Sequence, residues 1–119
     1  MAHDKRVLQT VKTMLGLPEE QTVFDAEILL HINSAMSVVN QLGVGPEAGI
    51  TVDQYTLWIE IFDDPRQNHL VSYVYYKVRL VFDPPGTSYA IQSFEKMAKE
   101  AEWRLNVQVE SEVNHVRLS

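Results

Sequence analysis

Cysteine is absent from the 119 residues of this chain, so it has neither a disulfide framework nor a thiolate site for zinc or redox chemistry. Long hydrophobic runs are absent as well: no segment approaches the roughly 20 apolar residues that cross a bilayer. The first ten residues, MAHDKRVLQT, lack the apolar core of a secretory signal. We therefore expect a cytosolic protein that does not contact a membrane.

Positive charge is scarce. The 10 lysines and arginines are outnumbered by 16 acidic residues, which gives a net charge of −6. A nucleic-acid-binding protein normally presents a basic face, so this balance argues against a protein that grips DNA. The length and the hydrophobic content of 45% are those of one folded domain with a core of its own.

Patterns typical of catalytic and metal sites are missing too. The glycines of GVGPEAG (43–49) are not followed by the lysine and hydroxyl residue of a phosphate-binding loop. Asp63-Asp64 precedes Pro65, which favours a helix start over a metal-binding pair. No two histidines stand at the i,i+4 spacing of a helical metal site; they are His3, His31, His69 and His115. We expect no enzyme, no metal and no cofactor.

Helical periodicity dominates what is present. It predicts a helix over 4–15 that ends at Gly16, and a helix capped by Thr22 that ends at Gly43. A short helix is expected to open at Thr51, and a last one to run from Thr87 or Ser88 to about Asn106. The strongest apolar stripe lies on the second of these helices: Phe24, Ile28, Ile32, Ala35, Val39 and Leu42.

The segment YVYYKVRLVFDPP (73–85) fits two structures. Its apolar residues alternate as in a strand, yet Val71, Val74, Val78 and Val81 also share one helix face. Length favours the helix, because a capped start at Asp64-Pro65 and a stop before Pro84 enclose about 18 residues. Residues 70–82 are apolar nearly all round, so we expect this helix to be buried on more than one side, with one side in the core of its own chain and another against a second chain.

Two features of the C-terminal part are left open. Trp103 falls opposite the inward stripe of the last helix, so it is either an interface residue or is buried by a bend. Residues 107–118 lose helical period and are either a disordered tail or an arm that adds a strand to a partner. The predicted fold is all-α, with about five helices in a compact bundle (1–106) followed by an extended tail (107–119).

Three blocks together resemble the head–tail connector (adaptor) proteins of bacteriophages with long non-contractile tails. They are HINSAMSVVNQLGVGP (31–46), YVYYKVRLVFDPP (73–85) and EAEWRLNVQVE (100–110), and VLQTVKTMLGLPEEQTVFD (7–25) fits the same pattern. The resemblance covers about residues 5–110. It implies a helical subunit of the virion neck, assembled in the host cytoplasm into a ring that is conventionally dodecameric. That ring would join the portal protein to the stopper or tail and extend the DNA channel after packaging.

A ring subunit needs two different contact patches, and these residues are our predictions for its contacts. For the subunit interface they are Tyr73, Tyr76, Lys77, Leu80 and Trp103. For the portal, reached by strand addition, they are Val107, Val109, Val113, Val116 and Leu118. For a tail-facing loop, which could equally be a plain connection between helices, they are Val44, Pro46 and Glu47.

DNA is expected to pass through the channel without sequence-specific binding, because lumen carboxylates repel phosphates. Two alternatives remain at this point. One is another neck component, a stopper or tail-completion protein, which would contain more β-structure. The other is a small helical DNA-binding regulator, although its most basic helical stretch, YKVRL (76–80), has only two cations among apolar neighbours.

Overall fold

The computed structural model describes residues 5–62 and 67–118, together with the side chains of 5–62 and 68–110. Within them the chain forms four α-helices: α1 (Val7–Met14), α2 (Asp25–Gln41), α3 (Gln67–Phe82) and α4 (Ser88–Leu118). One 3₁₀ turn, η2 (Trp58–Glu60), precedes α3. Apart from a single antiparallel bridge between Arg6 and Leu57, the described residues contain no β-structure. The all-α prediction is confirmed.

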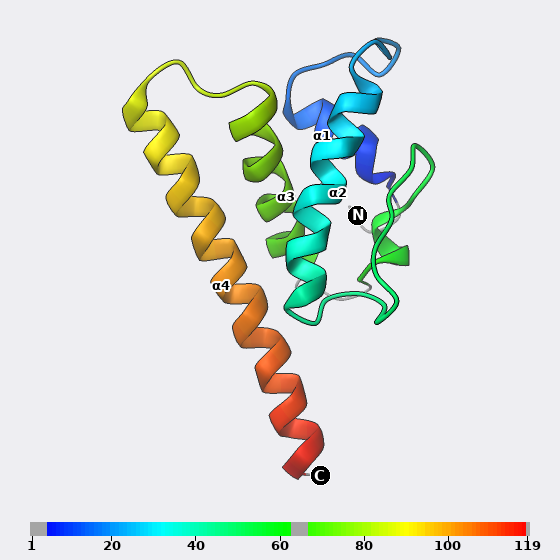
Figure 1. The fold of residues 1–119 in the computed structure, drawn as a ribbon, viewed down its shortest axis with the longest axis vertical. Coiled ribbons are helices and arrows are strands. Elements are labelled where there is room, and N and C mark those ends of the chain that lie inside the picture. The colour runs from blue at the N-terminus through cyan, green and yellow to red at the C-terminus, as the bar shows by residue number, and fades with distance from the viewer. Residues whose placement is uncertain (1–4, 63–66, 119) are drawn as a thin grey trace.

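The helices are layered, and α3 is the middle layer. It packs on α4 along one side and on α2 along the other, while α1 packs against both α2 and α3 (Figure 1). Leu70, Tyr73, Val74 and Val78 of α3 are at most 1% exposed. The segment that fitted both a strand and a helix is therefore a helix. It is buried on two sides, but α2 and α4 of the same chain cover both, whereas a second chain was expected to cover one of them. Its proposed cap at Asp64-Pro65 lies outside the described residues.

Two helix ends follow from glycine. Gly16 and Gly43 both have positive φ, +80° and +105°, which residues with a Cβ rarely adopt. At the end of α2, the Gly43 N–H donates to the Asn40 carbonyl (3.0 Å) and the Val44 N–H donates to the Val39 carbonyl (3.2 Å). This is the Schellman arrangement that satisfies the last carbonyls of a helix. Both predicted stops are therefore confirmed.

The prediction of a helix after Thr51 is wrong, and so is the total of five helices. Residues 51–57 form bonds to a distant side chain and local side-chain bonds instead of the i,i+4 backbone bonds of a helix. The Asn33 side chain accepts from the Val52 N–H (2.8 Å) and donates to the Val52 carbonyl (3.0 Å). The Asp53 carboxylate accepts from the Tyr55 N–H (2.8 Å), which is the competing local bond that keeps such residues out of helices. Only the turn η2 remains, where Trp58 is fully buried.

The start of α2 also differs from the prediction. The helix begins at Asp25, and no side chain caps its first turn, so Thr22 does not form the expected capping box. At α4 the prediction holds, because the Thr87 hydroxyl accepts from the Ala90 N–H (3.1 Å).

The extended C-terminal tail is a second correction. Helix α4 passes residue 106 without a break and continues to Leu118, and its last turns project beyond the rest of the molecule (Figure 1). No glycine or proline follows Pro85 and Gly86, so nothing in the sequence terminates the helix there. Adding residues to an existing helix is also far easier than starting a new one. The alternation of Val107 and Val109 was a misleading strand signal.

A pair of leucines tests which helix faces form the core. Leu70→Ala should lower the free energy of unfolding by about 2–5 kcal/mol, because Leu70 is fully buried and its removal leaves a cavity. Leu30→Ala is the matched control, since Leu30 is 64% exposed on α2 and should change the value by less than about 0.5 kcal/mol. Urea unfolding followed by circular dichroism measures both. Equal losses would contradict the layer order.

Candidate assembly surfaces

No three histidines, aspartates or glutamates within 5–62 and 67–118 gather closely enough to hold a metal ion. None of the described helices is long and apolar enough to span a bilayer. The candidate sites are exposed apolar side chains and the grooves between elements.

The predicted interface residues on α3 lie on its side toward α4. Tyr73 is 1% exposed and belongs to the core of the subunit itself. Burial, reinforced by the Glu102 carboxylate, raises the pKa of Tyr73 to about 12. Lys77 is exposed and Leu80 half-buried. Both line a groove of about 490 Å³ between α3 and α4, with Ile91 and Glu102 on its opposite wall.

Tyr76 is engaged within the subunit. Its ring meets Phe94 of α4 edge-on, with centroids 5.3 Å apart, and lies 5.3 Å from the ring of Tyr75. The Arg79 guanidinium lies 5.7 Å from the Phe94 centroid and donates to the Tyr75 hydroxyl (3.2 Å). These aromatic contacts attach α4 to α3. Of the predicted interface residues, Tyr73 and Tyr76 therefore already serve the subunit's own packing.

Trp103 lies on the outer side of α4 and is 61% exposed, so no bend of the helix buries it. Lys96 and Lys99 precede it by seven and four residues, and Val107 follows it by four, which places all four on one helix face. We call Lys96, Lys99, Trp103 and Val107 the α4 outer stripe. Val107 is 36% exposed. Neither lysine forms an ion pair with a described residue.

The residues predicted to bind the portal divide into two groups. Val109 packs against the core, and a Cβ added to Gly43 would lie 2.9 Å from its Cγ1, so the helix and the loop approach closely there. The side chains of the other three, Val113, Val116 and Leu118, lie outside the described ones, although the backbone there is helical.

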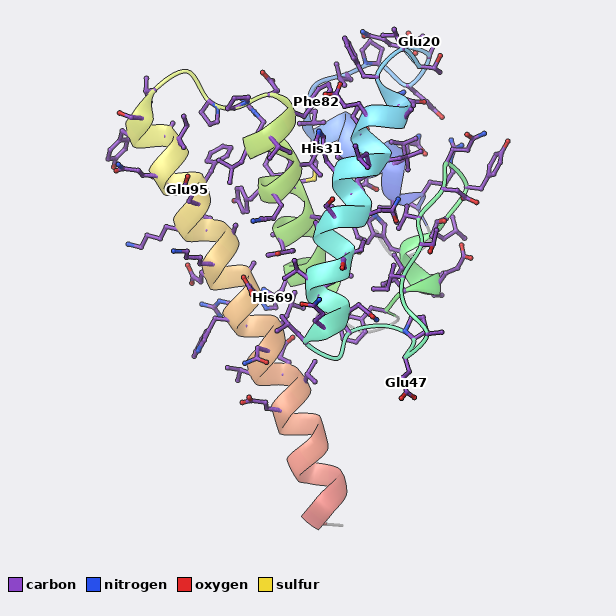
Figure 2. The ribbon with its side chains drawn as sticks, in the orientation of Figure 1. Glu20, His31, Glu47, His69, Phe82 and Glu95 are labelled. Atoms are coloured by element: carbon purple, nitrogen blue, oxygen red, sulfur yellow. The ribbon has the colours of Figure 1, made fainter. Side chains whose placement is uncertain are left out.

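The predicted tail-facing loop lies at the same end of the molecule as the C-terminus of α4 (Figure 2). Val44 is 1% exposed and therefore belongs to the core. The Asn40 amide donates to the carbonyls of Val44 (3.0 Å) and Pro46 (2.9 Å) and so fixes the loop. Pro46 and Glu47 are exposed, and Glu47 points away from the protein.

Sequence reasoning missed a second groove, on the far side of the molecule from α4. It measures about 680 Å³ and lies between the start of α1, the start of α2 and the 50s loop. We call it the α1–α2 groove. Its lining includes Leu8, Lys12, Asp25, Ala26, Leu29 and Tyr55. Tyr55 on its rim is 67% exposed.

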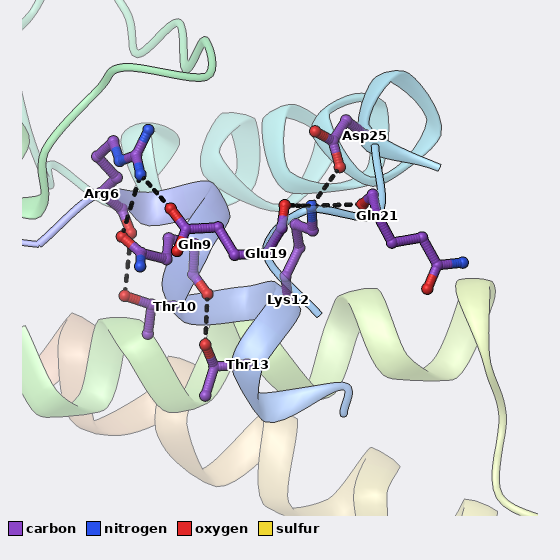
Figure 3. A network of polar contacts seen from close by, with 8 residues as sticks. All are labelled: Arg6, Gln9, Thr10, Lys12, Thr13, Glu19, Gln21 and Asp25. Carbon is purple, nitrogen blue, oxygen red and sulfur yellow. Dashed lines mark hydrogen bonds and ion pairs between the residues drawn. The ribbon is translucent and has the colours of Figure 1, made fainter. Parts of the chain in front are cut away.

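A buried lysine shapes this groove. The Lys12 side chain is 4% exposed, and its ammonium donates to the carbonyls of Glu19 (3.0 Å) and Gln21 (2.6 Å). The Asp25 carboxylate completes the site at 2.9 Å (Figure 3). Nearby, Arg6 pairs with Glu19 at 2.7 Å. A buried charge is tolerated only when paired and hydrogen-bonded, so Lys12 holds the loop after α1 against the start of α2.

Comparison with known proteins places these surfaces in context. Residues 7–112 match the family model described as phage connector protein. The chain belongs to the phage connector protein family. Neither the curated proteins nor the solved structures contain a significant match.

Membership of this family accounts for the exposed apolar surfaces described above. A connector is a structural component of the phage neck that associates with other head or tail components. Such a protein needs surfaces for other subunits and no catalytic centre, which agrees with exposed apolar side chains on two opposite sides of this connector. The resemblance drawn from the sequence blocks is confirmed.

The raised pKa of Tyr73 predicts a loss of stability at alkaline pH. The phenol ionises at about 10 in the unfolded chain and at about 12 in the folded one. Its contribution to stability is therefore complete below about pH 10 and is lost as the pH rises to about 12. Urea unfolding from pH 8 to 12 should show a smaller loss for Tyr73→Phe than for the wild-type connector.

Tyr89→Phe is the control for that series, because the Tyr89 side chain is 81% exposed and its hydroxyl is not buried by folding. The free energy of unfolding of Tyr89→Phe should change with pH as that of the wild type does. Parallel curves for Tyr73→Phe and the wild type would contradict the burial of the phenol.

The Lys12 site gives a further prediction. Asp25→Asn removes the carboxylate but leaves the buried ammonium of Lys12, so it should lower the free energy of unfolding by about 2–3 kcal/mol. The loss is smaller than for a fully buried pair, because the Asp25 side chain is 24% exposed. Glu27→Gln, an exposed carboxylate in the same helical turn, should change it by less than about 0.5 kcal/mol. Equal effects in urea unfolding would show that Lys12 does not depend on Asp25.

Proposed function

We propose that this chain is the head–tail connector (adaptor) subunit that forms a ring between the portal protein and the stopper or tail, and so extends the DNA channel after packaging. Family membership supports a connector role. The observation that carries the finer assignment is the C-terminal part of α4, which projects as a helix beyond the body of the subunit (Figure 1). No other element of the described chain lies beside the last turns of this helix. The helix is therefore suited to reach a neighbouring component.

The portal contact predicted for 107–118 becomes, in this proposal, a contact of residues 111–118, as a helix instead of an added strand. Val109 remains attached to the subunit through its contact with Gly43, so the segment that is free to dock begins after Glu110. Loop 43–49 lies at the same end. We therefore assign Pro46 and Glu47 to the portal-facing end, which departs from the expectation of a tail-facing loop.

The tail-facing end in this proposal is the opposite one. It carries the loop 15–24, which contains the labelled Glu20, and the 83–87 connection between α3 and α4 (Figure 2). The first of these loops is held in place by Lys12, as described above. A stopper or tail component therefore meets a loop of fixed shape, which lowers the entropic cost of binding.

DNA passes through the ring without being gripped. The described residues of 5–62 carry seven carboxylates and three cations besides histidine, so this half of the subunit is acidic. Carboxylates facing the lumen repel phosphates and let DNA slide. Arg79 of α3 is already engaged with Asp83 and Tyr75. The three cations among the described side chains of α4 are outnumbered by four glutamates on the same stretch, so this part of α4 lacks the net positive charge of a recognition helix. This argues against a DNA-binding regulator.

A stopper or tail-completion protein is the remaining alternative within the neck. We expect such proteins to contain more β-structure, whereas the described residues hold one isolated bridge and otherwise helices, turns and loops. The helical composition therefore favours the adaptor position.

Truncation after Glu110 tests the portal contact. Removing residues 111–119 should abolish attachment to portal-bearing heads, because the projecting turns of α4 would be lost. The fold should survive, because the core side chains described on α4, among them Ala101, Leu105 and Val109, all precede the cut. Negative-stain microscopy of heads mixed with each chain shows whether the portal gains a ring of added protein, which we call the collar. Circular dichroism with urea unfolding checks the fold. A stable truncated chain that still adds a collar would refute the portal contact. Intact protein that never adds one would refute the adaptor role.

A further inference from the structure

The α4 outer stripe has no partner among the described residues. Trp103 is 61% exposed and Val107 36% exposed. A large exposed aromatic beside an apolar neighbour is characteristic of interface cores. Lys96 and Lys99 extend the stripe toward the N-terminus of the helix, and both are exposed without an ion pair to a described residue. The stripe is therefore apolar at one end and cationic at the other.

The α1–α2 groove has the complementary properties. Leu8, Ala26 and Leu29 give it apolar walls, and Tyr55 stands exposed on its rim. Leu30, one helical turn after Ala26, is 64% exposed and extends the apolar surface along α2. A volume of about 680 Å³ is ample for an indole ring.

The surroundings of the groove are acidic. Its own charges are neutralised internally, since Arg6 pairs with Glu19 and Lys12 with Asp25. Three exposed carboxylates stand next to its lining residues in the chain: Glu20, Glu27 and Asp53. The Tyr55 N–H and the Thr56 hydroxyl lower the pKa of Asp53, so this carboxylate stays ionised. Among the described residues, Lys5 is the single exposed cation next to a lining residue, so carboxylates outnumber cations three to one beside the groove, and cations accompany the stripe.

The two surfaces lie on opposite sides of the subunit. Helix α4 packs on α3, and α3 packs on α2, whereas the groove lies between the start of α1, the start of α2 and the 50s loop. Within one chain the stripe cannot reach the groove. A contact between them must join two chains, and it repeats head to tail, as a closed ring requires.

We propose that the α4 outer stripe of one subunit docks in the α1–α2 groove of the next, with Trp103 as the central buried side chain and Lys96 and Lys99 facing the groove's carboxylates. The proposal rests on the ring of the proposed function and names the surfaces that build it. A symmetric contact between two α4 stripes is disfavoured, because it would bring four unpaired lysines together.

Cysteine cross-linking tests this arrangement directly, because the natural chain has no cysteine and each introduced thiol is unique. Val107→Cys places a thiol on the stripe, and Gln54→Cys places one on the groove lining. The two single variants are mixed, assembled on portal-bearing heads and treated with a short bismaleimide. We expect links between Val107→Cys and Gln54→Cys chains, and none within either variant alone.

Matched variants then test the named side chains. Trp103→Ala, introduced into both cysteine variants, should reduce the yield of mixed links about tenfold or more, as for a central interface aromatic. Tyr89→Ala is the control, because Tyr89 is a still more exposed aromatic (81% against 61%) on the same helix, 14 residues before Trp103 and beyond the N-terminal end of the stripe. It should leave the yield unchanged. Lys99→Glu should also reduce the yield, and added salt should lower it in the wild-type background.

The outcomes separate this inference from the proposed function. Links within Val107→Cys alone, or links from Val107→Cys to the portal in place of Gln54→Cys, overturn the docking of stripe in groove. So does a collar that forms with no mixed links. In each of these cases the collar itself still supports the connector ring. Heads that gain no collar with the wild-type chain overturn the ring, and the inference with it.

Discussion

The burial of α3 on two sides is the constraint on which the rest of the molecule depends. A chain of 119 residues without disulfides must obtain its stability from a single core, and that core is built on both faces of one helix. Toward α4, the rings of Tyr75 and Tyr76 pack on Phe94. Toward the start of α2, Phe82 meets Phe24 edge-on at 5.4 Å. Because α3 occupies the middle, α2 and α4 become outer layers, and each keeps one face toward solvent.

The loops are fixed by a second set of interactions, in which long or amide side chains satisfy backbone groups. Lys12 binds two carbonyls of the loop before α2, Asn33 pairs with the backbone of Val52, and Asn40 holds the loop after α2. Each bond replaces water at a polar group that the core would otherwise leave unsatisfied. The loops around the α1–α2 groove are therefore rigid enough to form a surface of defined shape.

Sequence reasoning succeeded where one signal was strong over many residues. The helix at 67–82 could be predicted because its length and its proline stop exclude a strand, and the ends of α1 and α2 follow from single glycines. It failed where distant contacts decide. The Thr51 region has acceptable helix signals, yet Asn33, 19 residues away, takes its backbone bonds. Lysine is normally exposed, so nothing in the sequence marked Lys12 as buried or predicted the groove that it shapes.

The layer order has a consequence for assembly. A stack of α4, α3 and α2 presents two outer faces that differ in sequence, in charge and in shape. An isologous dimer needs one self-complementary patch, whereas unlike faces on opposite sides favour contacts that repeat in one direction. Whether such a chain of contacts closes is set by the angle between the faces, which the rigid α3 layer holds constant. The same double burial that stabilises the single subunit therefore also fixes the rotation from one subunit to the next.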